Sequence, residues 1–339
     1  MHAVPLCALA TALLFPAAAG AQTLFAVSYP YGAEVPNVPL SYLHEVNPAT
    51  GVLDGGRPIM FQRQYAAGER PAAIGIAQAP DGRVYVLSLV VPYGRLGELW
   101  ELDVRTATAT YLFPLGGNYY EGDLACDNAG RLVGGVRYSE VPAGPPSLIF
   151  VSRQPGFWTW GNLTPYIVGP QGSSDINGLA FAGGTLYATF CASQEPDTLR
   201  TLDPATGAVL SSVPLSVDVG NTGGLAYRAR TETLFMAARV GASSEIRFYT
   251  VDPTTGEATT IGTMGAVPVW ALAFIRVCGT SDFNGDGDFG TDQDIEAFFA
   301  CFGGNCCNGC GSADFNDDGD YGTDQDIEAF FRVLAGAAC

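Results

Sequence analysis

The stretch Asp203-Pro-Ala-Thr-Gly207 (DPATG) recurs along the first 277 residues of this 339-residue chain. It returns as Asn47-Pro-Ala-Thr-Gly51 and Asp252-Pro-Thr-Thr-Gly256, with a weaker relative at Asp103-Val-Arg-Thr-Ala107. In a tight hairpin, Asp or Asn bonds back to the backbone, Pro sets φ, and Gly adopts the left-handed conformation before the next strand. Successive turns lie about 50 residues apart, which indicates a repeated unit of short strands.

A second short pattern keeps the same spacing. It places a glycine just before Ile-Ala or Leu-Ala, followed by a turn and an apolar run. The copies are Gly75-Ile-Ala, Gly122-Asp-Leu-Ala, Gly178-Leu-Ala-Phe and Gly224-Leu-Ala-Tyr, with runs at residues 83–88, 131–136, 185–190 and 233–238. Small residues suit an innermost strand, where repeated units crowd around an axis. About four strands in each 50-residue unit predict a β-propeller.

The first and last segments of this region together make one complete unit. Residues 24–28 begin a unit with no Gly-Leu-Ala strand before it, and Val269–Ile275 (VWALAFI) supplies such a strand with nothing after it. We therefore expect a mainly β fold, an approximately five-bladed propeller over residues 22–277 that is closed by its C-terminal strand. A weak unit near residues 157–170 leaves six blades open, and an open β-sandwich is the structural alternative.

The last 62 residues contain a different repeat. Residues 281–304 recur as residues 313–336, with 17 of 24 positions identical. Each copy opens with polar side chains at alternate positions, which turns them to one side of a loop as calcium requires. The expected ligands are Asp282, Asn284, Asp286 and Asp288 in the first copy, and Asp314, Asn316, Asp318 and Asp320 in the second, with Asp288 and Asp320 offering backbone carbonyls. The sixth position is Gly287 or Gly319, where the chain turns sharply.

The end of each loop departs from a standard EF-hand. Position twelve should carry a bidentate carboxylate, but it is Gln293 or Gln325. We predict that Asp294 and Asp326, one residue later, complete the two calcium sites. The alternative is that they only cap the helices that follow, because Thr-x-x-Asp resembles a capping box.

Each loop leads into an expected helix. Apolar residues recur at the spacing of one helical face, at Ile295, Phe298, Phe299 and Phe302, and again at Ile327, Phe330, Phe331 and Leu334. Phe289 and Tyr321, two residues after the loop glycines, are expected to tuck each loop against the core.

A tandem of calcium loop plus single helix resembles a dockerin module. Residues 278–339 are similar to the glycine- and cysteine-rich dockerin-like variety at the C-termini of secreted planctomycete proteins. The resemblance implies a module folded by two calcium ions that docks onto a cohesin-type receptor. It also implies recognition residues at loop positions ten and eleven, which match Thr291, Asp292, Thr323 and Asp324.

Charge and composition exclude several functions. Residues 278–339 hold 11 Asp and 2 Glu against Arg332 alone, and the whole chain has a net charge of −18. This acidity argues against nucleic-acid binding, which depends on Lys and Arg. All 16 cationic residues are arginine, so a catalytic lysine is excluded. Acids such as Asp123, Asp175, Glu121 and Glu245 stand in no recognisable catalytic setting. His44 lies in a strand-like run without an elbow motif, which argues against serine–histidine chemistry.

The N-terminus and the cysteines indicate export. Residues 1–21 combine an apolar stretch with Ala19-Gly20-Ala21, as in a secretory signal peptide, and no window is long enough to span a membrane. Six cysteines in the tail are disulfide candidates, as expected for a small exported domain. Repeat symmetry favours Cys278–Cys307 and Cys310–Cys339, which leaves Cys301–Cys306, although six cysteines allow 15 pairings. A zinc cluster from Cys306, Cys307 and Cys310 is the rival.

Three functions fit this sequence. The first is a secreted or cell-surface, non-catalytic propeller that binds an unidentified ligand or protein and is anchored by its calcium-dependent tail. The second is a propeller enzyme that acts on polysaccharide and is carried on a dockerin. The third is a tail that serves only as a sorting or envelope tag. An aromatic cluster of Phe157, Trp158, Trp160, Tyr119, Tyr120 and Trp100 could stack a sugar or form core.

Overall fold

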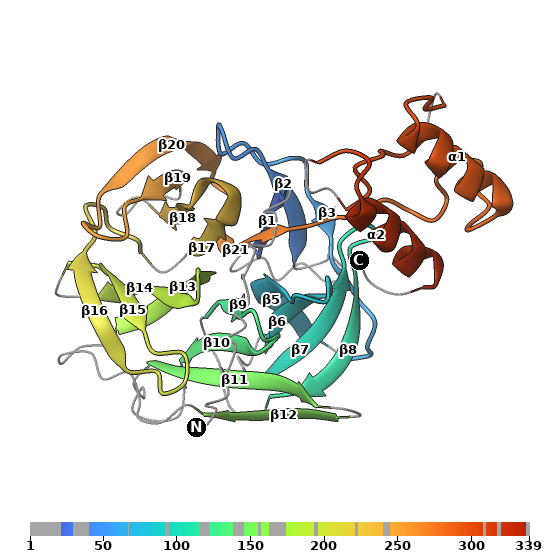
Figure 1. Ribbon diagram of the computed structural model, residues 1–339. Helices are drawn as coiled ribbons and strands as arrows, with labels where there is room; N and C mark the ends of the chain where they lie inside the picture. Colours follow the sequence, from blue (N-terminus) through green and yellow to red (C-terminus); the bar gives the residue numbers. More distant parts are fainter. Residues whose placement is uncertain are drawn as a thin grey trace, which may run out of the picture.

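The computed structural model describes residues 22–29, 41–66, 68–91, 95–115, 122–137, 146–154, 157–162, 174–192, 196–220, 223–239, 245–307, 310–316 and 320–336. The signal-peptide prediction for residues 1–21 falls outside these ranges. Strands dominate the first part of the chain, and both described α-helices lie in the tail (Figure 1).

The strands of the described residues form five sheets, each built mainly from neighbours in sequence. The first contains β21 (Val269–Ile275), β1 (Thr23–Ser28), β2 (Tyr42–Val46) and β3 (Arg57–Pro58). The second contains β5 (Arg70–Gln78), β6 (Val84–Val91), β7 (Arg95–Asp103), β8 (Thr108–Pro114) and β4 (Met60–Phe61). The third contains β9 (Leu124–Cys126), β10 (Leu132–Arg137), β11 (Pro146–Gln154) and β12 (Phe157–Asn162). The fourth contains β13 (Ser174–Ala182), β14 (Thr185–Ala192), β15 (Thr198–Leu202) and β16 (Val209–Pro214). The fifth contains β17 (Gly223–Arg228), β18 (Thr233–Arg239), β19 (Ile246–Val251) and β20 (Ala258–Gly265), with a short 3₁₀ helix, η1 (Ala229–Thr231), between β17 and β18.

The sheets surround a common centre (Figure 1). Their innermost strands β21, β5, β9, β13 and β17 contact one another in that order, and β17 contacts β21 to close the circle. Neighbouring strands within a sheet are antiparallel, apart from the short parallel pair of β4 and β8. The chain has a β-propeller-like fold. The strand that starts near residue 157 is β12 of the third sheet, so the weak unit predicted there is not a separate sheet in the described residues.

The glycine pattern marks the innermost strands, as predicted. A Cβ atom on Gly75 would lie 2.8 Å from the backbone nitrogen of Leu124 in the next sheet. A Cβ atom on Gly178 would lie 2.8 Å from the nitrogen of Leu225. Real Cβ contacts are never so short, so glycine is what allows adjacent inner strands to approach.

The closing strand was also predicted correctly. β21 pairs antiparallel with β1, so that Leu24 lies opposite Phe274 and Val27 opposite Ala271. The first sheet is therefore built from both ends of the propeller region. This pairing joins segments about 250 residues apart and leaves no open edge at the junction.

The repeated turns form as expected. The side chain of Asp203 accepts a hydrogen bond from the nitrogen of Ala205 (2.8 Å), and Asp252 accepts one from Thr254 (2.8 Å). Gly207 and Gly256 have φ of 73° and 76°. The weaker relative ends in Ala107, which adopts a φ of 53° without being glycine.

The tail packs around four phenylalanines. α1 (Asp292–Phe302) and α2 (Asp324–Leu334) bring Phe298 and Phe330 together as stacked rings 4.2 Å apart, and Phe283 and Phe315 enclose them from the loops. Phe289 and Tyr321, predicted to fill that role, are instead 70% and 75% exposed. No helix in the described part of the chain is both long and apolar enough to cross a membrane.

Candidate functional site

Asp282 opens the first calcium-type loop and shows one unusual atom. Its Oδ2 accepts a hydrogen bond from the backbone nitrogen of Gly287 (3.1 Å), which closes the loop from position one to position six. Its Oδ1 is buried and has no hydrogen-bond partner. A buried carboxylate oxygen without a donor is costly unless a cation compensates it. Gly287 has φ of 92°, so the glycine at position six meets the expected conformational requirement.

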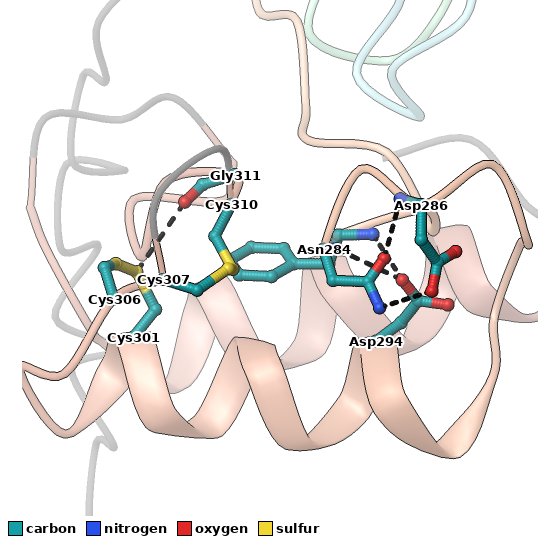
Figure 2. The surroundings of a disulfide bond; sticks show 9 residues. Asn284, Asp286, Asp294, Cys301, Cys306, Cys307, Cys310 and Gly311 are labelled. Carbon is teal, nitrogen blue, oxygen red and sulfur yellow. Dashed lines mark hydrogen bonds between the residues drawn. A yellow bond between two sulfur atoms is a disulfide. The ribbon is translucent and has the colours of Figure 1, made fainter.

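The side chains at the next alternating positions, Asn284 and Asp286, lie against each other in the loop before α1 (Figure 2). Asn284 Oδ1 accepts a hydrogen bond from the nitrogen of Asp286 (2.9 Å), and Asp286 Oδ1 accepts one from Asp288 (2.9 Å). Asn284 Nδ2 donates to Asp286 Oδ2 (2.8 Å). These short-range bonds hold positions three and five in a tight curve and face their side chains toward each other.

In Asp294, by contrast, each carboxylate oxygen accepts two hydrogen bonds from the protein. Its Oδ1 accepts hydrogen bonds from the nitrogens of Phe283 (2.7 Å) and Asn284 (3.2 Å). Its Oδ2 accepts from the nitrogen (2.8 Å) and hydroxyl (2.9 Å) of Thr291. Burial raises the pKa of Asp294, but these hydrogen bonds outweigh it and hold the pKa below its ordinary value. Four donors use the four lone-pair sites of a carboxylate, so the residue closes the loop onto the helix.

The second copy repeats this closure. Asp326 is fully buried and accepts the nitrogens of Phe315 (2.7 Å), Asn316 (3.3 Å) and Thr323 (2.7 Å), together with the Thr323 hydroxyl (2.9 Å). Both helices begin with a capping box. The capping alternative therefore describes what Asp294 and Asp326 do here, and their role as calcium ligands stays a prediction.

The two loops differ in how much of the predicted ligand set is described. Asp314 is buried, Asn316 is half-buried and Asp320 is exposed, whereas Asp318 lies outside the described residues. Within the described ranges, no three His, Cys, Asp or Glu side chains are gathered as a metal centre. The first loop nevertheless fits a hard cation, because Asp282 Oδ1 is buried without a donor and Asn284 and Asp286 offer side-chain oxygens two and four residues later.

Among the predicted recognition residues, the threonines and the aspartates have different surroundings. Thr291 accepts a hydrogen bond from the nitrogen of Asp294 and donates one to its carboxylate, and Thr323 donates to Asp326 in the same way. Asp292 and Asp324 are exposed. The threonine hydroxyls are thus engaged in capping, while the aspartates remain accessible. Their role in binding a partner stays a prediction.

Sequence reasoning missed an exposed aromatic face. Phe299 and Phe331 were assigned to one apolar face of each helix together with Phe298 and Phe330, but they are 42% and 44% exposed, with ring centroids 6.3 Å apart. Phe298 and Phe330 take the inward positions, and a neighbouring residue on a helix points about 100° away from the one before it. We call Phe299 and Phe331 the aromatic face of the tail; Phe289 and Tyr321 are exposed as well.

The disulfides follow local spacing. Cys301 pairs with Cys306, as predicted, and Cys307 pairs with Cys310 (Figure 2). The Cα atoms of Cys307 and Cys310 are 5.3 Å apart in the segment after α1. These pairs close short loops, for which the entropy of closure is small.

The symmetric pairing is therefore wrong. Cys307 does not pair with Cys278, which is itself disulfide-bonded. Cys310 does not pair with Cys339, which lies outside the described residues. The rival zinc cluster is also excluded, because Cys306, Cys307 and Cys310 are all oxidised.

In the propeller, the side chains of Ser28, His44 and Asp54 follow one another in a row. Ser28 Oγ lies 2.9 Å from His44 Nε2, and His44 Nδ1 lies 3.6 Å from Asp54 Oδ1. However, Ser28 is only 1% exposed. The second sheet has the same arrangement at the matching positions, where Trp100 Nε1 donates to Ser88 Oγ (2.9 Å). An indole cannot act as a base, so this serine-to-ring hydrogen bond is a packing feature of the fold.

A shallow groove runs beside His44. It separates the turn after β2 from the end of β20 and is lined by His44, Val52, Leu53, Asp54, Gly55, Thr263, Met264, Gly265 and Val267. The buried Ser28 is not part of its lining. The groove therefore gives a substrate no route to the serine.

The other propeller candidates have structural settings. Trp100 is completely buried in the core, so it cannot stack a sugar. Glu245 is exposed and lies near Arg247 and Thr263. Tyr119, Tyr120 and Glu121 lie outside the described residues, as do the side chains of Phe157, Trp158, Trp160 and Asp175.

Glu98 forms a buried polar cluster that the sequence did not reveal. It is 2% exposed, and its carboxylate accepts a hydrogen bond from Arg63 (2.5 Å) and another from the Tyr65 hydroxyl. Burial raises the pKa of Glu98, against the lowering effects of Tyr65 and Arg63. Burial and the Glu98 carboxylate raise the pKa of Tyr65. The cluster ties the segment before β5 to β7.

Asp123 is fully buried where the inner strands meet. Burial raises its pKa well above the ordinary range, although the nearby backbone N–H groups of Leu179, Leu124, Leu225 and Ile76 act in the opposite direction. It is enclosed by the fold and offers no catalytic setting.

Comparison with known proteins adds limited information. The chain matches no family model and no curated protein. A protein of unknown function from Dyadobacter fermentans aligns over 72% of this chain and 83% of its own, at 13% identity and a TM-score of 0.46. A Lactobacillus plantarum protein aligns over 73% and 68%, at 14% identity and a TM-score of 0.42. The periplasmic gluconolactonase of Pseudomonas aeruginosa aligns over 76% and 99%, at 11% identity and a TM-score of 0.40. At such low TM-scores, these similarities do not decide what this chain binds or catalyses.

Proposed function

We propose that this protein is an exported, non-catalytic β-propeller that binds a ligand or protein and is anchored to a surface or complex through a calcium-dependent, dockerin-like tail. We infer that the five sheets are its five blades. The observation that supports the calcium tether is the unpaired, buried Oδ1 of Asp282, in a loop that is closed by the hydrogen bond from Gly287 to Asp282 and in which Asn284 is hydrogen-bonded to Asp286.

The predicted calcium ions would be held by loop residues that leave the capping carboxylates in place. In the first loop these are Asp282, Asn284 and Asp286, with the backbone of Asp288. Calcium bound there would supply positive charge that offsets the clustered carboxylates and adds free energy of binding to the folded tail. Asp294 would connect the loop to α1 through its four hydrogen bonds.

Two loop positions test the metal directly. We would titrate calcium into residues 22–339 by calorimetry, and compare a variant carrying Asp286→Ala and Asp318→Ala. A control carrying Asp292→Ala and Asp324→Ala removes the same charge outside the first five loop positions. We expect two ions bound by the wild type and the control, and none by the loop variant. Absence of binding to the wild type would overturn the calcium tether.

The aromatic face supports a docking role for the tail. It places the same kinds of side chain at equivalent positions of the two repeats, on a module with 11 Asp and 2 Glu against a single Arg. Exposed aromatic side chains are unfavourable in water and are enriched at protein interfaces. The occupant that fits is a cohesin-type receptor with an apolar patch and a basic rim.

A binding assay tests this partner. Wild-type protein would be measured against a panel of purified cohesin-type domains, with calcium and with chelator. Phe299→Ser with Phe331→Ser tests the aromatic face, and Asp292→Ala with Asp324→Ala tests the predicted recognition aspartates. We expect calcium-dependent binding that each pair of substitutions weakens. If calcium binds but no cohesin-type domain does, the sorting-tag alternative is favoured.

A further inference from the structure

The innermost strands share a three-residue pattern with one exception. A small residue precedes Leu or Ile and then Ala in four of the five sheets, at Gly75, Gly178, Gly224 and Ala271. In the third sheet the equivalent residue is Asp123. A single carboxylate therefore stands at the position where the other sheets have almost no side chain.

The Asp123 carboxylate collects backbone donors from several sheets. Its Oδ1 accepts the nitrogen of Leu124 in β9 (2.7 Å), and its Oδ2 accepts the nitrogen of Leu179 in β13 (2.9 Å). The backbone N–H groups of Ile76 in β5 and Leu225 in β17 lie close enough to lower its pKa. All four amides occupy the same repeat position, directly after the small residue or, in the third sheet, directly after Asp123 itself.

The small residues explain why these amides can converge. A Cβ atom on Gly224 would lie 2.5 Å from the nitrogen of Leu272, and one on Gly75 would lie 2.8 Å from that of Leu124. Bulkier residues would push the strands apart and move the amides away from the centre. Repetition of one local geometry around a ring thus aims equivalent N–H groups at one point.

We propose that the centre of the ring is a carboxylate-binding site built from backbone amides of at least four sheets, and that Asp123 is the carboxylate it holds. The group is completely buried, it accepts the N–H groups of Leu124 and Leu179, and those of Ile76 and Leu225 lie close enough to lower its pKa. Charge-assisted hydrogen bonds to a carboxylate are stronger than those between neutral groups. Asp123 therefore fastens β9 to β13 and fills the axis at this level.

The first test removes the side chain and supplies a substitute. Asp123→Ala in residues 22–339 leaves the buried N–H groups of Leu124 and Leu179 without their acceptor and should lower the melting temperature of the propeller by roughly 5–15 °C. Formate, a small free carboxylate, should restore a substantial part of this loss at concentrations of hundreds of millimolar, because it binds only the folded site. Benzoate is too large for the space and should not.

The matched control is Asp197→Ala. Asp197 is also buried and accepts the nitrogen of Val219 (2.5 Å), but it lies just before β15, away from the inner strands. Its loss should destabilise the protein without any rescue by formate beyond the effect seen on the wild type. Equal rescue of both variants would show a general salt effect and overturn the proposal.

A second variant covers the case in which Asp123→Ala does not fold. Asp123→Asn keeps the shape of the side chain, but it offers one acceptor oxygen and turns an NH₂ group toward N–H donors. We expect a lower melting temperature than that of the wild type, with no rescue by formate because the site is full. A wild-type melting temperature for Asp123→Asn would overturn the proposal.

Discussion

Two glycines with nearly the same φ allow the energetic cost of a positive φ to be distinguished from the cost of a steric contact. Gly256 and Gly265 have φ of 76° and 83°. A Cβ atom on Gly256 would lie 2.0 Å from the carbonyl oxygen of Pro214, whereas nothing lies within 4 Å of one on Gly265. Gly265→Ala should therefore cost about 1 kcal/mol of unfolding free energy, and Gly256→Ala at least about twice as much. Equal losses in urea denaturation would contradict this account.

Asp294 and Asp286 should respond differently to calcium. Asp294 accepts four protein donors, so Asp294→Ala should destabilise the tail by about 2–4 kcal/mol in chelator as well as in calcium. Asp286 is exposed, so Asp286→Ala should have its main effect only when calcium is present. Near-ultraviolet circular dichroism during thermal unfolding, with and without chelator, measures both. An Asp294 variant that is destabilised only in calcium would identify this residue as a ligand.

Single residues also show which structural features a sequence pattern can predict. The glycines of the inner strands and turns were predictable, because only a few residue types satisfy a close approach or a positive φ. The direction of Phe289 or Phe299 was not, because a helical or loop pattern does not fix which of two adjacent aromatic residues faces the core. Asp123 was predicted only to be an acid without a recognisable catalytic setting, because sequence alone does not show that amides of neighbouring sheets meet at its carboxylate.

At the scale of elements, β21 should decide whether the ring closes. It supplies the inner strand of the first sheet and pairs with β1 from Thr23 to Ser28. A chain ending at Val277 should keep a cooperative propeller transition, whereas one ending at Pro268 loses this pairing and should fail to fold or aggregate through its exposed edges. Circular dichroism and size-exclusion chromatography compare the two. A folded, monomeric chain ending at Pro268 would refute closure by this strand.

The turn aspartates should make the stability of the hairpins depend on acid. Hydrogen bonds from Ala205 and Thr206 hold the pKa of Asp203 below its ordinary value, and those from Thr254 do the same for Asp252. A depressed pKa means that stabilisation is present above the unfolded pKa and is lost as the pH falls from about 4 through the folded pKa. A variant with Asp203→Asn and Asp252→Asn should lose less stability than the wild type between about pH 5 and 2. Identical pH profiles of the melting temperature would contradict this.

Elements were easier to predict than their cross-links. Turn and inner-strand patterns repeat every unit, so each copy supports the others and the closing strand follows from the missing one. Disulfide pairing has no such redundancy. The symmetric pairs assumed that equivalent cysteines make equivalent bonds, but Cys307 and Cys310 lie close enough for a local bridge.

For the whole molecule, calcium should affect one of two unfolding transitions. The tail has its own phenylalanine core, and a contact that joins it to the propeller in the described residues is the hydrogen bond from Arg105 to the carbonyl of Gly279. Such a polar contact at the start of the tail predicts weak coupling between the two parts.

Differential scanning calorimetry of residues 22–339 measures that coupling. A hundredfold excess of calcium over its dissociation constant adds about 2.7 kcal/mol to the folded tail for each ion, and should raise only the smaller transition. The larger transition should coincide with that of a chain ending at Val277. If calcium raises both transitions, Arg105→Ala should restore the independence of the larger one, because it removes a contact that joins the propeller to the start of the tail. A single transition that neither calcium nor Arg105→Ala divides would show that the tail and the propeller unfold as one cooperative unit.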